Sequence, residues 1–164
     1  MKKTLIFILI TAITLSLFGC GKTQSRKPVS LSAEEIAEKI VSDSSFELPT
    51  LSSEQISADD NTSFSYYFGI EPPQSVKSAV VYSPVIATIP FYFGILILDS
   101  ENGISGTASE IEKKVDRNRL VCASYTTVLT GSVRNAIILV CDTNEERAIS
   151  LTNVFKEICN NNQQ

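Results

Sequence analysis

The chain has 164 residues, about one domain's length, and its 43% hydrophobic and 20% charged residues are typical of a globular protein rather than a disordered one. It contains no histidine, which excludes serine–histidine and cysteine–histidine nucleophile pairs, imidazole metal ligands and histidine pH switches. The net charge of −4 becomes −6 if a leader containing Lys2 and Lys3 is removed, and this acidic balance argues against nonspecific nucleic-acid binding.

The N-terminus has the pattern of a secretory leader. Lys2 and Lys3 precede residues 4–18, an uncharged and mostly apolar run. A helix of that length spans about 22 Å, short of the roughly 30 Å hydrocarbon core, so a signal peptide over residues 1–19 fits better than a permanent membrane helix. The run ends with Leu-Phe-Gly followed by Cys20, which resembles the bacterial lipobox.

We therefore expect Cys20 to receive diacylglycerol and to begin the mature chain. Two acyl chains suffice for stable anchoring, which predicts a protein held at the cell membrane on its extracytoplasmic face. An ordinary secretory signal or a buried apolar segment is the alternative. The rest of residues 20–30 is polar and predicts a flexible tether with a reach of about 17 Å. Residues 31–164 are expected to form a single α+β domain.

Three segments begin with a hydroxyl residue followed three positions later by glutamate, which is the pattern of a helix capping box. The pairs are Ser32 with Glu35, Thr107 with Glu110, and Thr143 with Glu146. An apolar stripe at helical spacing follows each pair. The inward residues are expected to be Ala33, Ile36, Ala37, Ile40 and Val41 in the first helix; Ile111, Val115 and Cys122 in the second; and Ala148, Leu151, Phe155 and Ile158 in the third.

The strand candidates lie between these helices. They are residues 64–68, 76–83, 91–99 and 135–142, and the last two contain continuous apolar runs typical of central strands. Residues 48–63, rich in serine and acids, are expected to be irregular. The order of segments predicts an α+β fold in two layers, with a mostly antiparallel sheet of three to four strands and about three helices packed largely on one face.

This arrangement resembles a family of short bacterial lipoproteins, domain-of-unknown-function family 4358. The resemblance covers most of the mature chain. It rests on the lipobox, the helix at 33–41, the segments 67–70 and 79–82, the strand ending at Asp99, the helix that carries Arg117 and closes near Tyr125, and the final strand and helix. It implies location and fold, and it assigns no catalytic residue and no cofactor.

Three cysteines remain after lipidation: Cys122, Cys141 and Cys159. Their spacing matches no zinc motif, and three thiols without histidine make a poor zinc site. They are interpreted as small buried hydrophobes or as one disulfide, joining Cys141 to Cys122 or to Cys159, with one thiol left free. A catalytic thiol is disfavoured because no general base lies nearby in sequence.

Two carboxylates at strand ends are the least implausible acid–base pair. Asp99 and Asp142 would lie close together if their strands ended at the same edge of the sheet, and a glycan hydrolase requires two such neighbouring carboxylates. The alternative is that both residues start turns. No glycine-rich phosphate loop and no Ser-x-x-Lys at a helix start accompanies them. The most basic local cluster comprises Lys113, Lys114, Arg117 and Arg119. It is interpreted as a solvated helix face rather than as a surface that contacts anionic lipid headgroups or wall polymers.

Residues 83–93 form the most distinctive segment. Pro84 and Pro90 bracket an apolar stretch, which predicts an edge or a loop because proline cannot donate to a sheet ladder. The candidate interaction surface comprises Ile89, Phe91, Tyr92 and Phe93. The alternative is that these side chains belong to the core.

The functional hypothesis is a non-enzymatic binding or interaction module at the cell envelope, without a cofactor or metal, whose partner would be another envelope protein. Two alternatives stand beside it. One is a carboxylate-based hydrolase of envelope glycan, and the other is a purely structural envelope lipoprotein.

Overall fold

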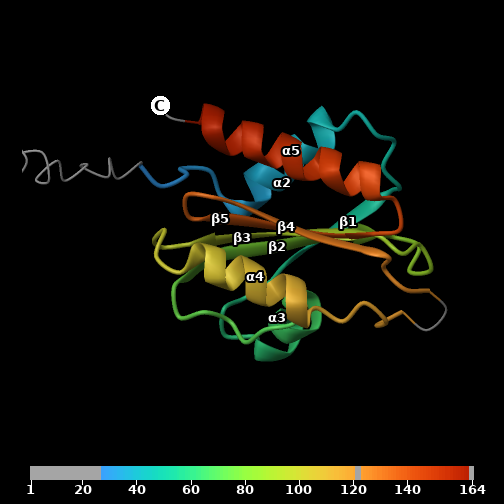
Figure 1. Ribbon diagram of the computed structural model, residues 1–164, viewed down its shortest axis with the longest axis horizontal. Helices are drawn as coiled ribbons and strands as arrows, with labels where there is room; N and C mark the ends of the chain where they lie inside the picture. Colours follow the sequence, from blue (N-terminus) through green and yellow to red (C-terminus); the bar gives the residue numbers. More distant parts are fainter. Residues whose placement is uncertain (1–26, 121–122, 163–164) are drawn as a thin grey trace, which may run out of the picture.

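A five-stranded antiparallel sheet forms the centre of the computed structural model, which describes residues 27–120 and 123–162 (Figure 1). The strands lie in the order β1-β2-β3-β5-β4. In chain order the elements are α2 (Ala33–Asp43), β1 (Leu51–Gln55), α3 (Asn61–Phe68), β2 (Val76–Pro84), β3 (Tyr92–Leu98), α4 (Ile104–Lys114), β4 (Thr127–Val133), β5 (Ala136–Asp142) and α5 (Glu145–Asn161).

The predicted α+β class is confirmed, with differences in the layers. The described residues contain five strands and four helices, and the helices cover both faces of the sheet rather than mainly one (Figure 1). The reason lies in β3 and β5, whose residues are buried at every position. Because side chains alternate between faces, a fully apolar strand needs a covering layer on each side.

One face of the sheet packs against α2 and α5. The core there joins Ile36 and Ile40 of α2 to Phe93 of β3 and to Leu151 and Phe155 of α5, and all five side chains are fully buried. Burying a side chain of this size contributes about 1.5–3 kcal/mol. This face therefore holds the first and last helices of the described chain together.

The opposite face packs against α3 and α4. Phe64 and Phe68 of α3, Ile111 of α4 and Leu96 of β3 meet in a second apolar core. The two layers approach closely at Gly94, where an added Cβ would lie 2.9 Å from a ring carbon of Phe68. A side chain at this position would force the buried ring of Phe68 to shift.

Strand register defines two ends of the sheet. Tyr92 at the start of β3 pairs with Cys141 near the end of β5, and Ile97 pairs with Ala136. One end, here called the distal end, therefore holds the β2–β3 loop, Asp142 and the start of α5. The other, the tether end, holds the β4–β5 turn. The seven residues of β3 separate the two ends by about 20 Å.

The first residues that the structure describes are fixed at the tether end. The backbone N–H of Val29 donates to the side-chain oxygen of Asn135 at 2.8 Å, and Arg134 donates to the carbonyl of Lys27 at 3.0 Å. Val29 is 2% exposed, so the folded domain begins slightly before residue 31. The predicted signal peptide, Cys20 and most of the predicted tether lie outside the described residues.

The predicted helix starts agree with the structure to different degrees. Ser32 and Glu35 form the capping box expected for α2. The start predicted for α4 is wrong, because the helix begins at Ile104, directly after Gly103 in a left-handed conformation. At α5 the cap is Asn144, one residue after Thr143, and its side chain accepts from the N–H of Arg147.

The prediction of a strand over residues 64–68 is wrong, since this segment is the second half of α3. The side chain of Asp60 accepts from the N–H of Ser63 and begins the helix, and Gly69 ends it with φ of 70°. Phe64 and Phe68 are four residues apart and face the same core. Tertiary packing therefore overrides the β-propensity of the aromatic run.

Two strands were not predicted. Strand β1 lies inside the segment expected to be irregular and pairs only with β2, so its mostly exposed side chains carry no apolar pattern. Strand β4 is the other edge and contains Gly131, which lies against Thr152 of α5. No described helix is long and apolar enough to cross a membrane.

Candidate functional site

The predicted interaction surface at residues 89–93 is wrong. Phe91, Tyr92 and Phe93 are at most 1% exposed, and Ile89 is half-buried against the core. The pleat of β3 explains this, because Phe91 and Phe93 enter the core beneath α2 and α5 while Tyr92 enters the opposite core. The alternative interpretation, that the aromatic residues belong to the core, is correct.

The same segment nevertheless carries exposed apolar side chains. Val85 and Ile86 lie in the β2–β3 loop, and each is 63% exposed. Two further exposed residues lie toward the distal end: Val41 in the last turns of α2 and Ile149 in the second turn of α5. We call these four residues the distal tip. Their exposure leaves unburied apolar surface at the end of the sheet farthest from the tether.

The loop between α2 and β1 joins the parts of the distal tip. The hydroxyl groups of Ser45 and Ser150 lie 3.3 Å apart, which ties this loop to α5. The N–H of Val85 donates to the carbonyl of Thr50 at 3.0 Å, which ties the same loop to the β2–β3 loop. Four exposed carboxylate residues belong to this part of the protein: Asp43, Glu47, Glu145 and Glu146.

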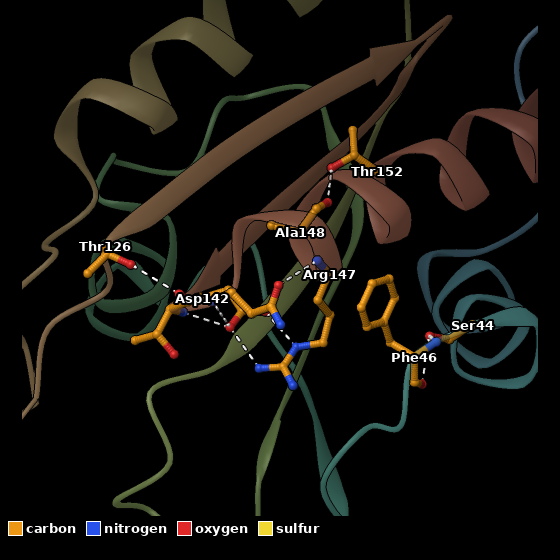
Figure 2. A network of polar contacts seen from close by, with 9 residues as sticks. Ser44, Phe46, Thr126, Asp142, Arg147, Ala148 and Thr152 are labelled. Carbon is orange, nitrogen blue, oxygen red and sulfur yellow. Dashed lines mark hydrogen bonds and ion pairs between the residues drawn. The ribbon is translucent and has the colours of Figure 1, made fainter.

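Asp142 is a structural residue at the distal end (Figure 2). Its side chain is fully buried and accepts from the backbone N–H groups of Thr143 and Asn144 at 2.7 and 2.9 Å. Arg147 donates to both carboxylate oxygens, from Nε and Nη2, at 2.7 Å each. The guanidinium of Arg147 also lies 4.8 Å from the ring centre of Phe91. These contacts join the end of β5 to the first turn of α5.

Asp99 and Asp142 do not form a pair. The antiparallel register places Asp99, directly after β3, at the tether end, whereas Asp142 ends β5 at the distal end. Asp99 is exposed and Asp142 is buried with its arginine. Carboxylates separated by about 20 Å cannot act on one glycosidic bond, which needs separations below about 10 Å. The predicted catalytic pair is therefore excluded.

Cys141 and Cys159 are free thiols on opposite faces of the sheet. Burial raises the pKa of each thiol to about 12. The predicted Cys141–Cys159 disulfide is contradicted because the sheet separates the two side chains. The other predicted pairing involves Cys122, which lies outside the described residues. Within residues 27–120 and 123–162, no three acidic or cysteine side chains are grouped to hold a metal ion.

The basic residues at the end of α4 do not form one solvated face. Lys114 pairs with Glu110 at 2.6 Å on the helix surface, while Arg117 and Arg119 lie in the loop that follows. Arg119 turns inward. It enters the aromatic cluster between α3 and the sheet, and this arrangement was not predicted.

Four of the chain's five tyrosines surround the Arg119 guanidinium. The carbon Cζ lies 3.9 Å from the ring centre of Tyr92, 4.5 Å from Tyr66, 4.9 Å from Tyr67 and 5.5 Å from Tyr125. An arginine over aromatic faces is stabilised by the negative potential of the rings. The cluster therefore supports a half-buried cation without an ion pair to a described carboxylate.

Hydrogen bonds hold this cluster in one arrangement. Arg119 donates from Nε to the hydroxyl of Tyr125 at 3.2 Å and from Nη1 to the carbonyl of Tyr66 at 3.0 Å. The hydroxyl of Tyr92 donates to the carbonyl of Tyr67 at 2.8 Å, and that of Tyr67 donates to Glu54 at 2.7 Å. Burial, followed by the bond to Glu54, raises the pKa of Tyr67 to about 12.

An open hollow of about 700 Å³ adjoins the cluster. Its lining is Asn61, Thr62, Ser65, Tyr66, Asp116 and Arg119. Tyr66 is 51% exposed there, which makes it the most exposed of the large aromatic side chains in the described chain. Thus the buried side of the cluster is a fixed aromatic support, and its outer side is an open depression in which polar side chains surround one exposed ring.

Comparisons with family models, with curated proteins and with solved structures find no match for this chain. The resemblance to the family of bacterial lipoproteins stays a prediction that rests on the residues quoted for it. The distal tip and the Arg119 cluster are the two surface features of the described chain from which a function can be inferred.

Proposed function

We propose that the chain is a lipoprotein of the 4358 type, anchored by diacylglycerol on Cys20 to the extracytoplasmic face of the cell membrane. The leader and lipobox support this proposal. The first described residues add to it, because Lys27 and Val29 are held at one end of the sheet. A tether that leaves from this end directs the opposite end of the domain away from the anchor.

We propose further that the protein is a non-enzymatic interaction module that docks an envelope protein with its distal tip. The observation that carries this proposal is the exposure of Val85 and Ile86, 63% each, at the end of the sheet opposite the tether. Burying a whole side chain of this type contributes about 1.5–3 kcal/mol, so about two-thirds of that is available from each residue. A tip that points away from the membrane can present this apolar surface to a neighbouring protein.

The charges around the distal tip indicate the chemistry of the partner. The exposed carboxylates of Asp43, Glu47, Glu145 and Glu146 favour an apolar centre surrounded by lysine or arginine on the partner. They disfavour insertion of the tip into an anionic lipid surface, where like charges would repel. Binding through such a rim should weaken as salt screens the charges.

The non-enzymatic part of the proposal is supported by the separation of Asp99 and Asp142. A purely structural envelope lipoprotein remains the alternative, and partner capture distinguishes the two. The full-length protein would be crosslinked in intact cells and recovered from membranes. We expect a partner in fixed stoichiometry that the Ile86→Asp variant loses.

Thr88 provides the matched control for this experiment. It is exposed in the same loop, so Thr88→Asp adds the same charge without removing an apolar side chain. We expect Thr88→Asp to retain the partner. Equal capture by both variants would show that the tip is not the interface, and the absence of any reproducible partner would favour the structural alternative.

The anchor has its own test. Cys20→Ser should abolish incorporation of labelled palmitate and should release the protein or leave an uncleaved precursor. Processing and membrane retention identical to those of the parent would contradict the lipobox assignment.

A further inference from the structure

We propose that the hollow beside Arg119 is a binding site for a neutral saccharide, with the exposed ring of Tyr66 as the platform for one sugar ring. This site lies beside α3 and the loop after α4, and its residues are distinct from those of the distal tip. Saccharide binding at this site is independent of docking through the distal tip.

Tyr66 has the geometry of an aromatic platform. Arg119 lies 4.5 Å from its ring centre, and the ring of Tyr67 meets it edge-on at 4.9 Å with an interplanar angle of 81°. These contacts fix the ring although the residue is half exposed. A pyranose presents an apolar face of C–H groups, and that face is complementary to the exposed π-surface of a fixed aromatic ring.

The rest of the lining suits the hydroxyl edge of a sugar. Asn61 and Thr62 belong to the first turn of α3, and Asp116 faces them from the loop after α4. Arg119 donates from Nε to Tyr125 and from Nη1 to Tyr66. The two N–H donors of Nη2 therefore stay available for a ligand. Amide, hydroxyl, carboxylate and guanidinium groups together offer both donors and acceptors around the aromatic platform.

The charge of the hollow favours a neutral ligand over an anion. Asp116 offsets Arg119 within the lining. The N-terminus of α3 is already occupied by its own cap, because Asp60 accepts from the N–H of Ser63. A phosphate or carboxylate would therefore meet an acidic side chain and a helix end that is already neutralised.

A cationic ligand fits less well for a different reason. The Arg119 guanidinium lies 4.5 Å from the ring centre of Tyr66, so a second cation on this ring would meet its positive charge. What stays exposed is one face of one ring with polar groups around it. That combination matches a sugar, which has an apolar face and a polar edge.

The test is a titration of the purified full chain in detergent with two neutral probes, cellotetraose and the tetrasaccharide of β-1,4-linked N-acetylglucosamine. The chain has no tryptophan, so its fluorescence comes from five tyrosines, four of which belong to the Arg119 cluster, and calorimetry gives Kd. We expect saturable binding of at least one probe, and Tyr66→Ala should weaken it about tenfold.

Matched variants separate the platform from general damage. Tyr66→Phe keeps the ring and should retain binding, and Asn61→Ala should weaken it without removing the helix cap at Asp60. Tyr66→Phe keeps the ring contacts with Arg119 and Tyr67 and is expected to unfold at the temperature of the parent, whereas Tyr66→Ala loses the contact with Arg119 and should unfold cooperatively a few degrees lower. Failure to bind either tetrasaccharide, or unchanged affinity in Tyr66→Ala, would overturn the proposal. Binding of inorganic phosphate in place of both sugars would overturn it in favour of an anion site.

Discussion

Replacing Asp142 with asparagine tests whether this buried carboxylate joins the sheet to α5. The substitution preserves size and leaves one oxygen for the N–H groups of Thr143 and Asn144, which lie 2.7 and 2.9 Å from Oδ1. It places an amide NH₂ where Oδ2 now accepts from Nε of Arg147 at 2.7 Å. Two donors would then face each other, and the arginine would lose its counter-charge.

The expected cost follows from these contacts. A hydrogen bond to a charged group contributes about 1.5–3 kcal/mol, and removing one partner of a buried ion pair costs about 3–5 kcal/mol. Arg147 is 18% exposed, and water can replace part of what it loses, so we expect a destabilisation of about 3 kcal/mol. For a domain of this length that lowers Tm by about 10 °C.

Urea and thermal unfolding of the full chain, followed by far-ultraviolet circular dichroism, measure this loss. Asp99→Asn is the matched control, because the same chemical change is made at an exposed residue at the other end of the sheet. We expect it to change stability by less than about 0.5 kcal/mol. Equal destabilisation by the two variants, or a stable Asp142→Asn protein, would refute the reasoning.

Three further predictions concern backbone, thiols and alkaline stability. In urea unfolding, Gly69→Ala should lower the free energy of unfolding by about 3 kcal/mol and Gly103→Ala by about 1 kcal/mol. Both glycines have positive φ, but only at Gly69 would the added Cβ meet backbone atoms, which lie 2.5 Å away at the end of α4. Burial raises the pKa of each thiol to about 12, so Cys141 and Cys159 of the native chain should resist alkylation at pH 8. Peptide mass spectrometry should find these two residues labelled only after unfolding, and rapid labelling of the native protein would contradict the prediction. Burial, followed by the hydrogen bond to Glu54, raises the pKa of Tyr67 to about 12. The contribution of the protonated Tyr67 hydroxyl to stability is therefore complete below pH 10 and is lost as pH rises toward 12. Tyr67→Phe should reduce this alkaline loss of stability, and an unchanged dependence of stability on pH would contradict the prediction.

Local chemistry made several elements predictable. The capping box at Ser32 and Glu35 is visible in four consecutive residues, and it forms as expected. The apolar runs that form β3 and β5 are continuous, so the existence and the central position of these two strands could be predicted from their composition alone. Pro84 and Pro90 correctly indicated the β2–β3 loop, since Pro84 is the last residue of β2 and Pro90 lies just before β3.

The missed features depend on contacts between distant segments. Residues 64–68 have strong β-propensity, and only the pairing of Phe64 and Phe68 beneath the sheet, with Asp60 and Gly69 at the ends, makes them helical. The aromatic run at 91–93 was ambiguous because its burial depends on two helix layers being present. A fully apolar β3 was in fact the signal that both faces of the sheet must be covered.

The Arg119 cluster could not be predicted because its tyrosines have no common spacing. Tyr66 and Tyr67 lie on α3, Tyr92 on β3, and Tyr125 just before β4. They meet only when α3 packs under the sheet and the loop after α4 folds back over it. The inward turn of Arg119 was hidden as well, since a basic residue near others of its kind usually faces solvent.

The attachment of Lys27 and Val29 beside the β4–β5 turn has a mechanical consequence. If the anchor holds this end and a partner holds the β2–β3 loop, any tension runs lengthwise through the central strands. The ladder bonds between β3 and β5 then resist shear together, whereas a pull across an edge strand would break them one after another. Such a domain would act as a stiff coupling that transmits force between a membrane and its neighbour through strands loaded along their length.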